Sequence, residues 1–227
     1  MKETEQNAFL LHARPFRDNQ LIAEFLTQDS GKVSAITYIG TSLKSNKKAL
    51  LQPFSPLVIV LKGQGDLKKL VRVEASQKSF LLSKDFLYSG FYINELLNKL
   101  LAEHIPCEAL YLLYRTSLQA LSEQTALEPI LRRFEQSLLE ELGLTIDYSI
   151  LLEHNQAQFY YKPEQGLVPC IETCTNIRYA KEHLLAIEQQ DFTKPEVMRS
   201  YKQLMRQILN HLLAGKPLNS RKLFTKK

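Results

Sequence analysis

The sequence predicts an α+β protein with two parts, a small β-barrel followed by a mainly α-helical region. The hydrophobic pattern changes near residue 80, from short runs with the two-residue period of strands to longer stretches with helical spacing. The positive charge is also unevenly divided, because residues 1–82 hold 12 basic and 7 acidic side chains whereas residues 83–227 hold 17 of each. We therefore expect one domain over residues 1–80 and a second over 81–227.

The first part contains short apolar runs separated by turn sequences such as QDSG and KGQGD, in which glycine supplies the unusual backbone angles. The longest connection follows the third run and contains KSNKKALLQ, which could form one or two helical turns. Five short strands with this connection favour an OB-fold barrel, and an SH3-like barrel is the alternative, since strand number alone does not fix topology. The expected strands are 7–12, 21–27, 32–39, 57–62 and 67–74.

The second part has the spacing of amphipathic helices, with Ser83 and Asp85 as candidate caps and prolines or glycines at the expected boundaries. Residues 144–176 form an irregular insert that contains two β-like pieces, DYSILLEH at 147–154 and AQFYYK at 157–162. The expected helices are 86–102, 108–123, 129–143, 180–189 and 196–213.

Residues 44–72 contain seven lysines and arginines but one acid, which is typical of a surface that binds a polyanion such as nucleic acid. A solvated, lysine-rich face is the alternative. Arg14 and Arg17 flank Phe16, so an arginine could bind a phosphate while the ring stacks on a base; core packing of Phe16 and an ion pair of Arg17 are the alternatives. The candidate DNA-binding residues are Lys44, Lys47, Lys48, Lys62, Lys68, Lys69 and Arg72, followed by Arg14, Arg17 and Lys32.

We expect neither a metal nor another cofactor. Cys170 and Cys174 form a C-x3-C pair, but a structural zinc site needs four ligands. A mixed site that adds His104 and Cys107 is conceivable, and ordinary thiols are the better interpretation. The phosphate-binding glycine loop, the G-x-S-x-G elbow and the H-E-x-x-H helix are all missing from the sequence, which argues against the enzyme classes that use them.

No apolar run approaches the roughly 18 to 20 residues of a membrane span, and the N-terminal residues do not resemble a secretory signal. Three cysteines also give no disulfide framework. We therefore expect a cytoplasmic protein that does not bind membranes.

The sequence resembles the RecO family of bacterial recombination-mediator proteins. Five segments carry the resemblance in order: AFLLHARPFRDNQLIAEFLTQDSGKVSAI, ALLQPFSPLVIVLKGQGDLKKL, YSGFYINELLNKLL, LRRFEQSLLEELG and GKPLNSRKLF. The resemblance spans nearly the whole chain. It implies an N-terminal OB-fold, a helical C-terminal domain and a non-enzymatic, nucleoid-associated role in recombination and DNA repair.

The resemblance also implies partners. RecO proteins bind single- and double-stranded DNA, anneal complementary strands, contact the C-terminal tail of single-stranded DNA-binding protein, and work with RecR to load RecA. By resemblance we place the tail site near Arg132 and Arg133, with Arg115 as a third candidate, because arginines beside an apolar helix face suit an acidic peptide with a hydrophobic end. Ion pairs with nearby glutamates are the alternative for these arginines. The competing function is a protein adaptor whose barrel binds an acidic protein and contacts DNA only incidentally.

Overall fold

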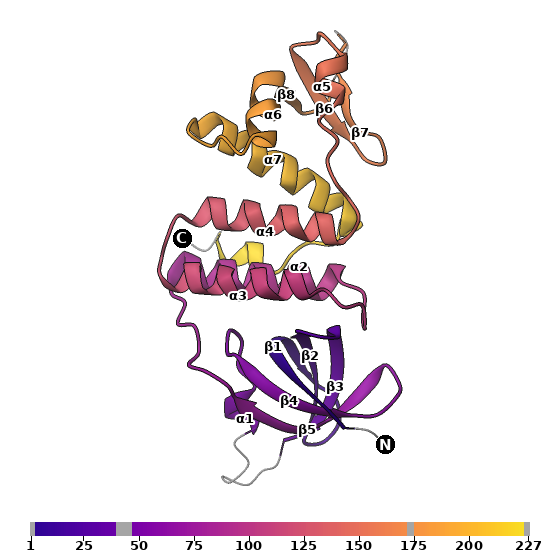
Figure 1. Cartoon of the computed structure of the whole chain (residues 1–227), viewed down its shortest axis with the longest axis vertical. Coiled ribbons are helices and arrows are strands. Elements are labelled where there is room, and N and C mark those ends of the chain that lie inside the picture. The colour runs from indigo at the N-terminus through magenta and orange to yellow at the C-terminus, as the bar shows by residue number, and fades with distance from the viewer. Residues whose placement is uncertain (1–2, 40–46, 172–174, 225–227) are drawn as a thin grey trace. The chain divides into compact units, whose positions relative to one another are not determined.

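The computed structural model describes residues 3–39, 47–171 and 175–224 (Figure 1). The chain forms two compact units, one of Met1–Phe134 with Leu218–Lys227 and the other of Glu135–Pro217. The domain boundary expected near residue 80 came from periodicity and charge and stays a prediction.

The first unit contains a closed barrel with the strand order β1-β2-β3-β5-β4. The barrel closes where β1 pairs with β4, and every pairing is antiparallel except that of β3 with β5. The single helical turn α1 lies between β3 and β4 in the chain, as expected for an OB-fold, so the OB-fold prediction is confirmed. The elements are β1 Glu3–Pro15, β2 Gln20–Thr27, β3 Gly31–Tyr38, α1 Lys47–Leu50, β4 Leu57–Lys62 and β5 Leu67–Ala75.

Alternate residues of the strands fill the barrel. Ala23 and Ala35 leave room for Phe25, and all three side chains are fully buried. The remaining core is aliphatic, so the barrel interior holds its shape by packing alone. Gly31 begins β3 with a φ of +66°, and a Cβ atom there would lie 1.8 Å from the carbonyl oxygen of Ile105, so only glycine fits this hairpin.

Helices α2 (Lys84–Leu100) and α3 (Glu108–Ser122) belong to the same unit, and they cover the outer side of β1. The Phe9 ring lies 5.0 Å from the Tyr114 ring in an edge-on contact. Asn94 accepts a 2.6 Å hydrogen bond from the Tyr114 hydroxyl and donates to the carbonyl groups of Leu10 and Leu11. Burial raises the pKa of Tyr114 far above its usual value, so the hydroxyl remains a donor and the contact between barrel and helix persists at any ordinary pH.

The remaining elements include a helix that spans both units, α4, and a three-stranded sheet with the order β7-β6-β8. Phe159 and Tyr179, on neighbouring strands of this sheet, are fully buried. The bounds are α4 Leu127–Glu141, α5 Ile150–Glu153, β6 Gln158–Lys162, β7 Gly166–Pro169, β8 Arg178–Ala180, α6 Lys181–Glu188, α7 Pro195–Leu212 and the 3-10 helix η1 Ser220–Leu223.

The five long helices lie within two residues of their expected bounds, whereas the irregular insert differs in one place. The β-like prediction for DYSILLEH is wrong, because Ile150–Glu153 form the helical turn α5. Asp147 accepts a 2.9 Å hydrogen bond from the backbone N–H of Ser149, and this local bond starts a turn in spite of the β-branched and aromatic residues around it. AQFYYK forms β6 as expected, and β7 and β8 were not expected. None of the helices in the described ranges is long and apolar enough to cross a membrane.

Candidate nucleic-acid interface

The outer surface of the barrel carries one cross-strand row that includes three of the predicted basic residues. Ala23 and Ala35 point into the core, so the residues next to them on β2 and β3 point outward. The row therefore lies on the outer side of the barrel and crosses every strand, with Ile22 buried and Ile36 half-buried within it. From β1 through β2, β3 and β5 to β4, it consists of Arg14, Ile22, Ile36, Lys69 and Lys62.

Two exposed aromatic side chains lie beside this row. Tyr38 is the next outward residue of β3 after Ile36, and it is 58% exposed. Phe16, in the turn between β1 and β2, is 43% exposed, and its N–H donates to the carbonyl of Gln20, which pairs with Tyr38. The Arg17 guanidinium lies 5.2 Å from the centre of the Phe16 ring. Tyr38 was not among the predicted residues, although its outward position follows from the two-residue period of the predicted strand 32–39.

We call this surface the aromatic–basic face. OB-folds hold single strands on β2, β3 and the adjoining loops, with cations for phosphates and aromatic rings for bases. Within the described ranges, the three cations of the face form no ion pair, so they are available to a polyanion. The face consists of Arg14, Phe16, Arg17, Tyr38 and Lys69.

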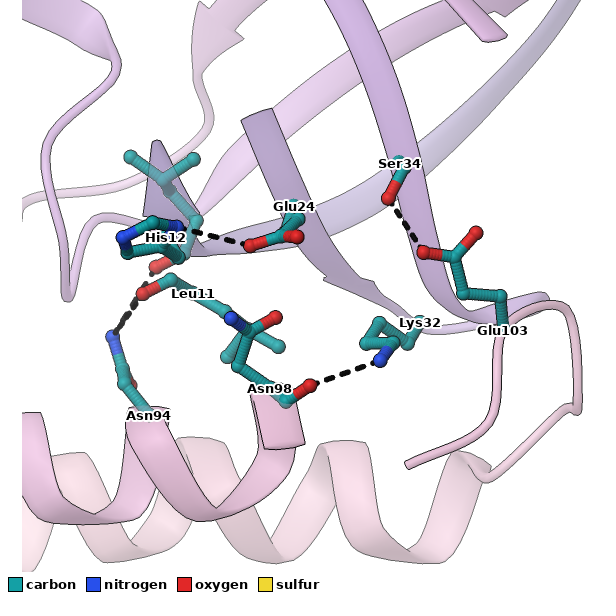
Figure 2. A network of polar contacts seen from close by, with 9 residues as sticks. Leu11, His12, Glu24, Lys32, Ser34, Asn94, Asn98 and Glu103 are labelled. Atoms are coloured by element: carbon teal, nitrogen blue, oxygen red, sulfur yellow. Dashed lines mark hydrogen bonds and ion pairs between the residues drawn. The ribbon is translucent and has the colours of Figure 1, made fainter. Parts of the chain in front are cut away.

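The opposite end of β3 is covered by the chain that follows α2, as Figure 2 shows. The Lys32 ammonium donates a 2.9 Å hydrogen bond to the carbonyl of Asn98, close to the end of α2, where the helix dipole favours a cation. Ser34 donates a 2.6 Å bond to the Glu103 carboxylate. The backbone N–H of His104 donates to the carbonyl of Lys32. Lys32 is thus occupied by an internal contact.

Lys62 and Arg72 face acidic side chains of β1 and β5. The Lys62 ammonium lies 3.2 Å from a carboxylate oxygen of Glu3, and Arg72 pairs with Glu5 and, at 3.6 Å, with Glu74. Glu3 and Glu5 were not predicted as partners because the expected first strand begins at residue 7, whereas β1 begins at Glu3. These pairs are exposed and individually weak, about 0–1 kcal/mol each, so a polyanion could replace them at small cost.

The other predicted cations of the barrel do not share one face. Lys68 pairs with the inward residue Ala35, so it points to the opposite side of the strand from Lys69. Lys47 donates a 3.3 Å hydrogen bond to the carbonyl of Val71, and Lys48 is exposed on α1. Lys44 lies outside the described residues.

The three arginines predicted for the acidic tail have different environments. Arg133 is exposed on α4, whereas Arg132 is 5% exposed. Arg115 is exposed on α3 and donates a 3.0 Å hydrogen bond to the side-chain oxygen of Gln77. The centre of the expected apolar face, Phe134 and Leu138, is fully buried. Arg133 therefore presents the most accessible guanidinium of α4.

The second unit contains a cavity of about 200 Å³. Its lining includes the carboxylates of Glu140 and Glu188 together with Leu139 and Met205. Burial raises the pKa of the lining residue Tyr148. Two carboxylates make this cavity unsuitable for the acidic tail.

Three of the four candidate metal ligands lie within the described residues. Cys107 is buried directly before α3 and Cys170 is half-buried directly after β7, while Cys174 lies outside the described residues. The His104 ring contacts the carbonyl oxygen of Asp66 at 3.2 Å. Over the ranges that the structure describes, no three histidine, cysteine or acidic side chains are grouped closely enough to hold a metal ion.

Comparison with known proteins identifies the family. The family model described as Recombination protein O N terminal matches residues 1–78, and that described as Recombination protein O C terminal matches residues 85–222. The chain belongs to the RecO family. It is 37% identical over 229 residues to the protein named DNA repair protein RecO from Pseudoalteromonas atlantica, covering 99% of this chain and 95% of that protein. It is 39% identical over 221 residues to the protein of the same name from Coxiella burnetii, covering 95% of each. The resemblance to the RecO family is therefore confirmed.

Proposed function

We propose that the chain is a non-enzymatic DNA-binding recombination mediator in DNA repair. The observation that carries this proposal is the aromatic–basic face, in which exposed Tyr38 and Phe16 lie beside Arg14, Arg17 and Lys69 on the ligand-binding side of an OB barrel. Cations neutralise phosphates without reading sequence, and rings stack on any base. A face of this kind suits a protein that must hold unrelated single strands.

Annealing follows from the same chemistry, because two complementary strands repel each other until their phosphates are neutralised. Double-stranded DNA offers the same phosphates and is included in the proposal. The relatives' printed name, DNA repair protein RecO, supports the biological setting. The chain would then act at the nucleoid in the cytoplasm.

The finer partner roles rest on family membership. We include binding of the acidic C-terminal tail of single-stranded DNA-binding protein, cooperation with RecR, and loading of RecA through that cooperation. For the tail, the exposed guanidinium of Arg133 on α4 is the first candidate, ahead of Arg115 and the buried Arg132.

The first test compares Tyr38→Ala with Tyr38→Phe in the binding of fluorescent oligothymidine, followed by fluorescence anisotropy. Loss of one stacked base should weaken binding by about 1–3 kcal/mol, whereas Tyr38→Phe keeps the ring and should bind as the wild type does. Equal affinities of all three proteins would remove Tyr38 from the site.

The second part of the test is a salt series with Arg14→Ala/Lys69→Ala. Loss of two phosphate contacts should make the log–log slope shallower by about 1.4, since each single-strand contact contributes about 0.7. The matched control is Lys78→Ala/Lys162→Ala, which removes two exposed lysines elsewhere and should leave the slope unchanged. A main partner interaction that is insensitive to salt, with no DNA binding at low salt, would favour the adaptor function instead.

A further inference from the structure

Helix α7 carries a straight row of positive charge on its exposed side. Arg199, Lys202 and Arg206 occupy positions i, i+3 and i+7 and are all exposed. At about 1.5 Å of rise per residue, the row extends over about 10 Å along the helix. Gln203 and Asn210, also exposed, lie on the same side at helical spacing. We call these five residues the α7 basic stripe.

The core fixes the direction of this stripe. The opposite side of α7 is buried, and two polar contacts hold the helix in place within its unit. The Tyr201 hydroxyl donates a 2.8 Å bond to Gln136 on α4, and the Tyr179 hydroxyl donates a 2.9 Å bond to Gln207. The buried residues are Val197, Tyr201, Leu204, Met205, Ile208 and Leu209. Rotation of the helix would expose this apolar face, so the stripe stays directed to solvent.

The charge of the stripe is unusual for its surroundings. Residues 135–217 hold 11 acidic and 8 basic side chains, yet three of the eight basic ones lie in this single row. Arg206 has no acidic residue three or four positions away on the helix, whereas Arg199 has Glu196 three positions before it. A solvated helix normally mixes the two signs at these spacings, because like charges four residues apart destabilise it. The arrangement therefore disfavours the helix locally and suits an external anion.

We propose that the α7 basic stripe is a second phosphate-binding surface for a nucleic-acid strand, separate from the aromatic–basic face of the barrel. The proposal extends the proposed function and rests on it, because two surfaces in one chain could each hold one of two complementary strands. Arginine, lysine, glutamine and asparagine are among the side chains that contact phosphate and sugar. The stripe has no exposed apolar residue among its members, which makes a peptide with a hydrophobic anchor a poorer match.

The experiment uses the full chain and fluorescent oligothymidine over a salt series. Arg199→Glu/Arg206→Glu is compared with Lys162→Glu/Lys216→Glu, which makes the same change in charge at exposed lysines of the same unit outside the stripe. The stripe variant should bind more weakly at low salt, and its log–log salt slope should be shallower by about 1.4. The control variant should have the same salt slope as the wild type. Arg199→Gln/Arg206→Gln should shift the slope in the same direction without introducing acids, and thermal melting followed by circular dichroism shows whether each variant is folded.

The outcomes separate this inference from the proposed function. If the wild type and the two stripe variants, Arg199→Glu/Arg206→Glu and Arg199→Gln/Arg206→Gln, bind with equal salt slopes, the stripe is a solvated face. The inference is then overturned, while the proposed function of the barrel stands. If the wild type binds no oligonucleotide at low salt, both fail. If the stripe variant loses affinity for a labelled poly-glutamate peptide but keeps its DNA slope, the stripe binds an acidic protein and the inference is again overturned. A variant that combines Arg14→Ala/Lys69→Ala with Arg199→Glu/Arg206→Glu tests whether the surfaces are separate. If the decrease in its salt slope equals the sum of the decreases in the two separate variants, the two surfaces bind DNA independently.

Discussion

The two ends of strand β3 have the same outward geometry and opposite surroundings. At the Tyr38 end, an aromatic ring and nearby cations are open to solvent. At the Lys32 end, the chain after α2 covers the strand and uses both the lysine and Ser34 for internal hydrogen bonds (Figure 2). A lysine on an OB strand is therefore no guide to ligand binding by itself. What matters is whether the protein's own chain has already supplied its partner.

Among the substitutions considered, one at Gly31, at the covered end of β3, should destabilise the protein most. Gly31→Ala places a Cβ atom within 1.8 Å of a backbone oxygen at a residue with a φ of +66°, so the segment around Ile105 must move. We expect the free energy of unfolding to fall by about 2–4 kcal/mol, measured by urea denaturation.

The matched control for this loss is Gly143→Ala. Gly143 has a φ of +72° but open space around the added Cβ, so it should cost about 1 kcal/mol for the backbone conformation alone. Equal losses at the two positions would show that the approach of Ile105 contributes nothing to stability.

The helix that leads into the covering segment also has a titratable contact. On α2, Glu95 accepts hydrogen bonds from the backbone N–H groups of Asn219 and Ser220 and pairs with Lys99 at 2.9 Å. Burial alone would raise the pKa of Glu95, but the hydrogen bonds from Ser220, Lys99 and Asn219 outweigh it and lower the pKa to about 2. A depressed pKa means that this stabilisation is present above the unfolded value of 4.5 and is lost as the pH falls towards 2.

Glu95→Gln should therefore be less stable than the wild type by about 1–2 kcal/mol at neutral pH, and the gap should close as the pH falls from about 5 towards 2. Urea denaturation at several pH values measures the gap. Glu153→Gln, which changes an exposed carboxylate, is the control, and its stability should equal that of the wild type at both neutral and acidic pH. A gap that stays constant with pH would mean that Glu95 acts through packing and not through its charge.

Much of the fold could be predicted from the sequence because it depends on period and composition. The alternation in β3 and the apolar spacing of α7 are local patterns, and both elements are present where they were expected. The surroundings of Lys32, Lys62 and Arg72 could not be predicted, since their partners come from distant parts of the chain: Asn98, Glu3 and Glu5. The sequence gives the number of cationic side chains in a segment. Whether those side chains can bind DNA depends on tertiary contacts that the local pattern does not contain.

The ion pairs of Lys62 and Arg72 should have only a small effect on DNA binding. Glu3→Gln/Glu5→Gln removes the carboxylates that face Lys62 and Arg72 on the outer side of β1, β4 and β5. If DNA on the aromatic–basic face extends along this row, the released cations should raise the affinity for oligothymidine two- to fourfold at low salt, or about 0.4–0.8 kcal/mol, with a steeper salt slope. Glu140→Gln/Glu141→Gln makes the same change in charge on α4 and should have a smaller effect. Equal effects of the two variants would mean that net charge alone is responsible. Lys62 and Arg72 would then lie outside the path of the strand, which would be limited to Tyr38, Phe16 and their neighbouring cations.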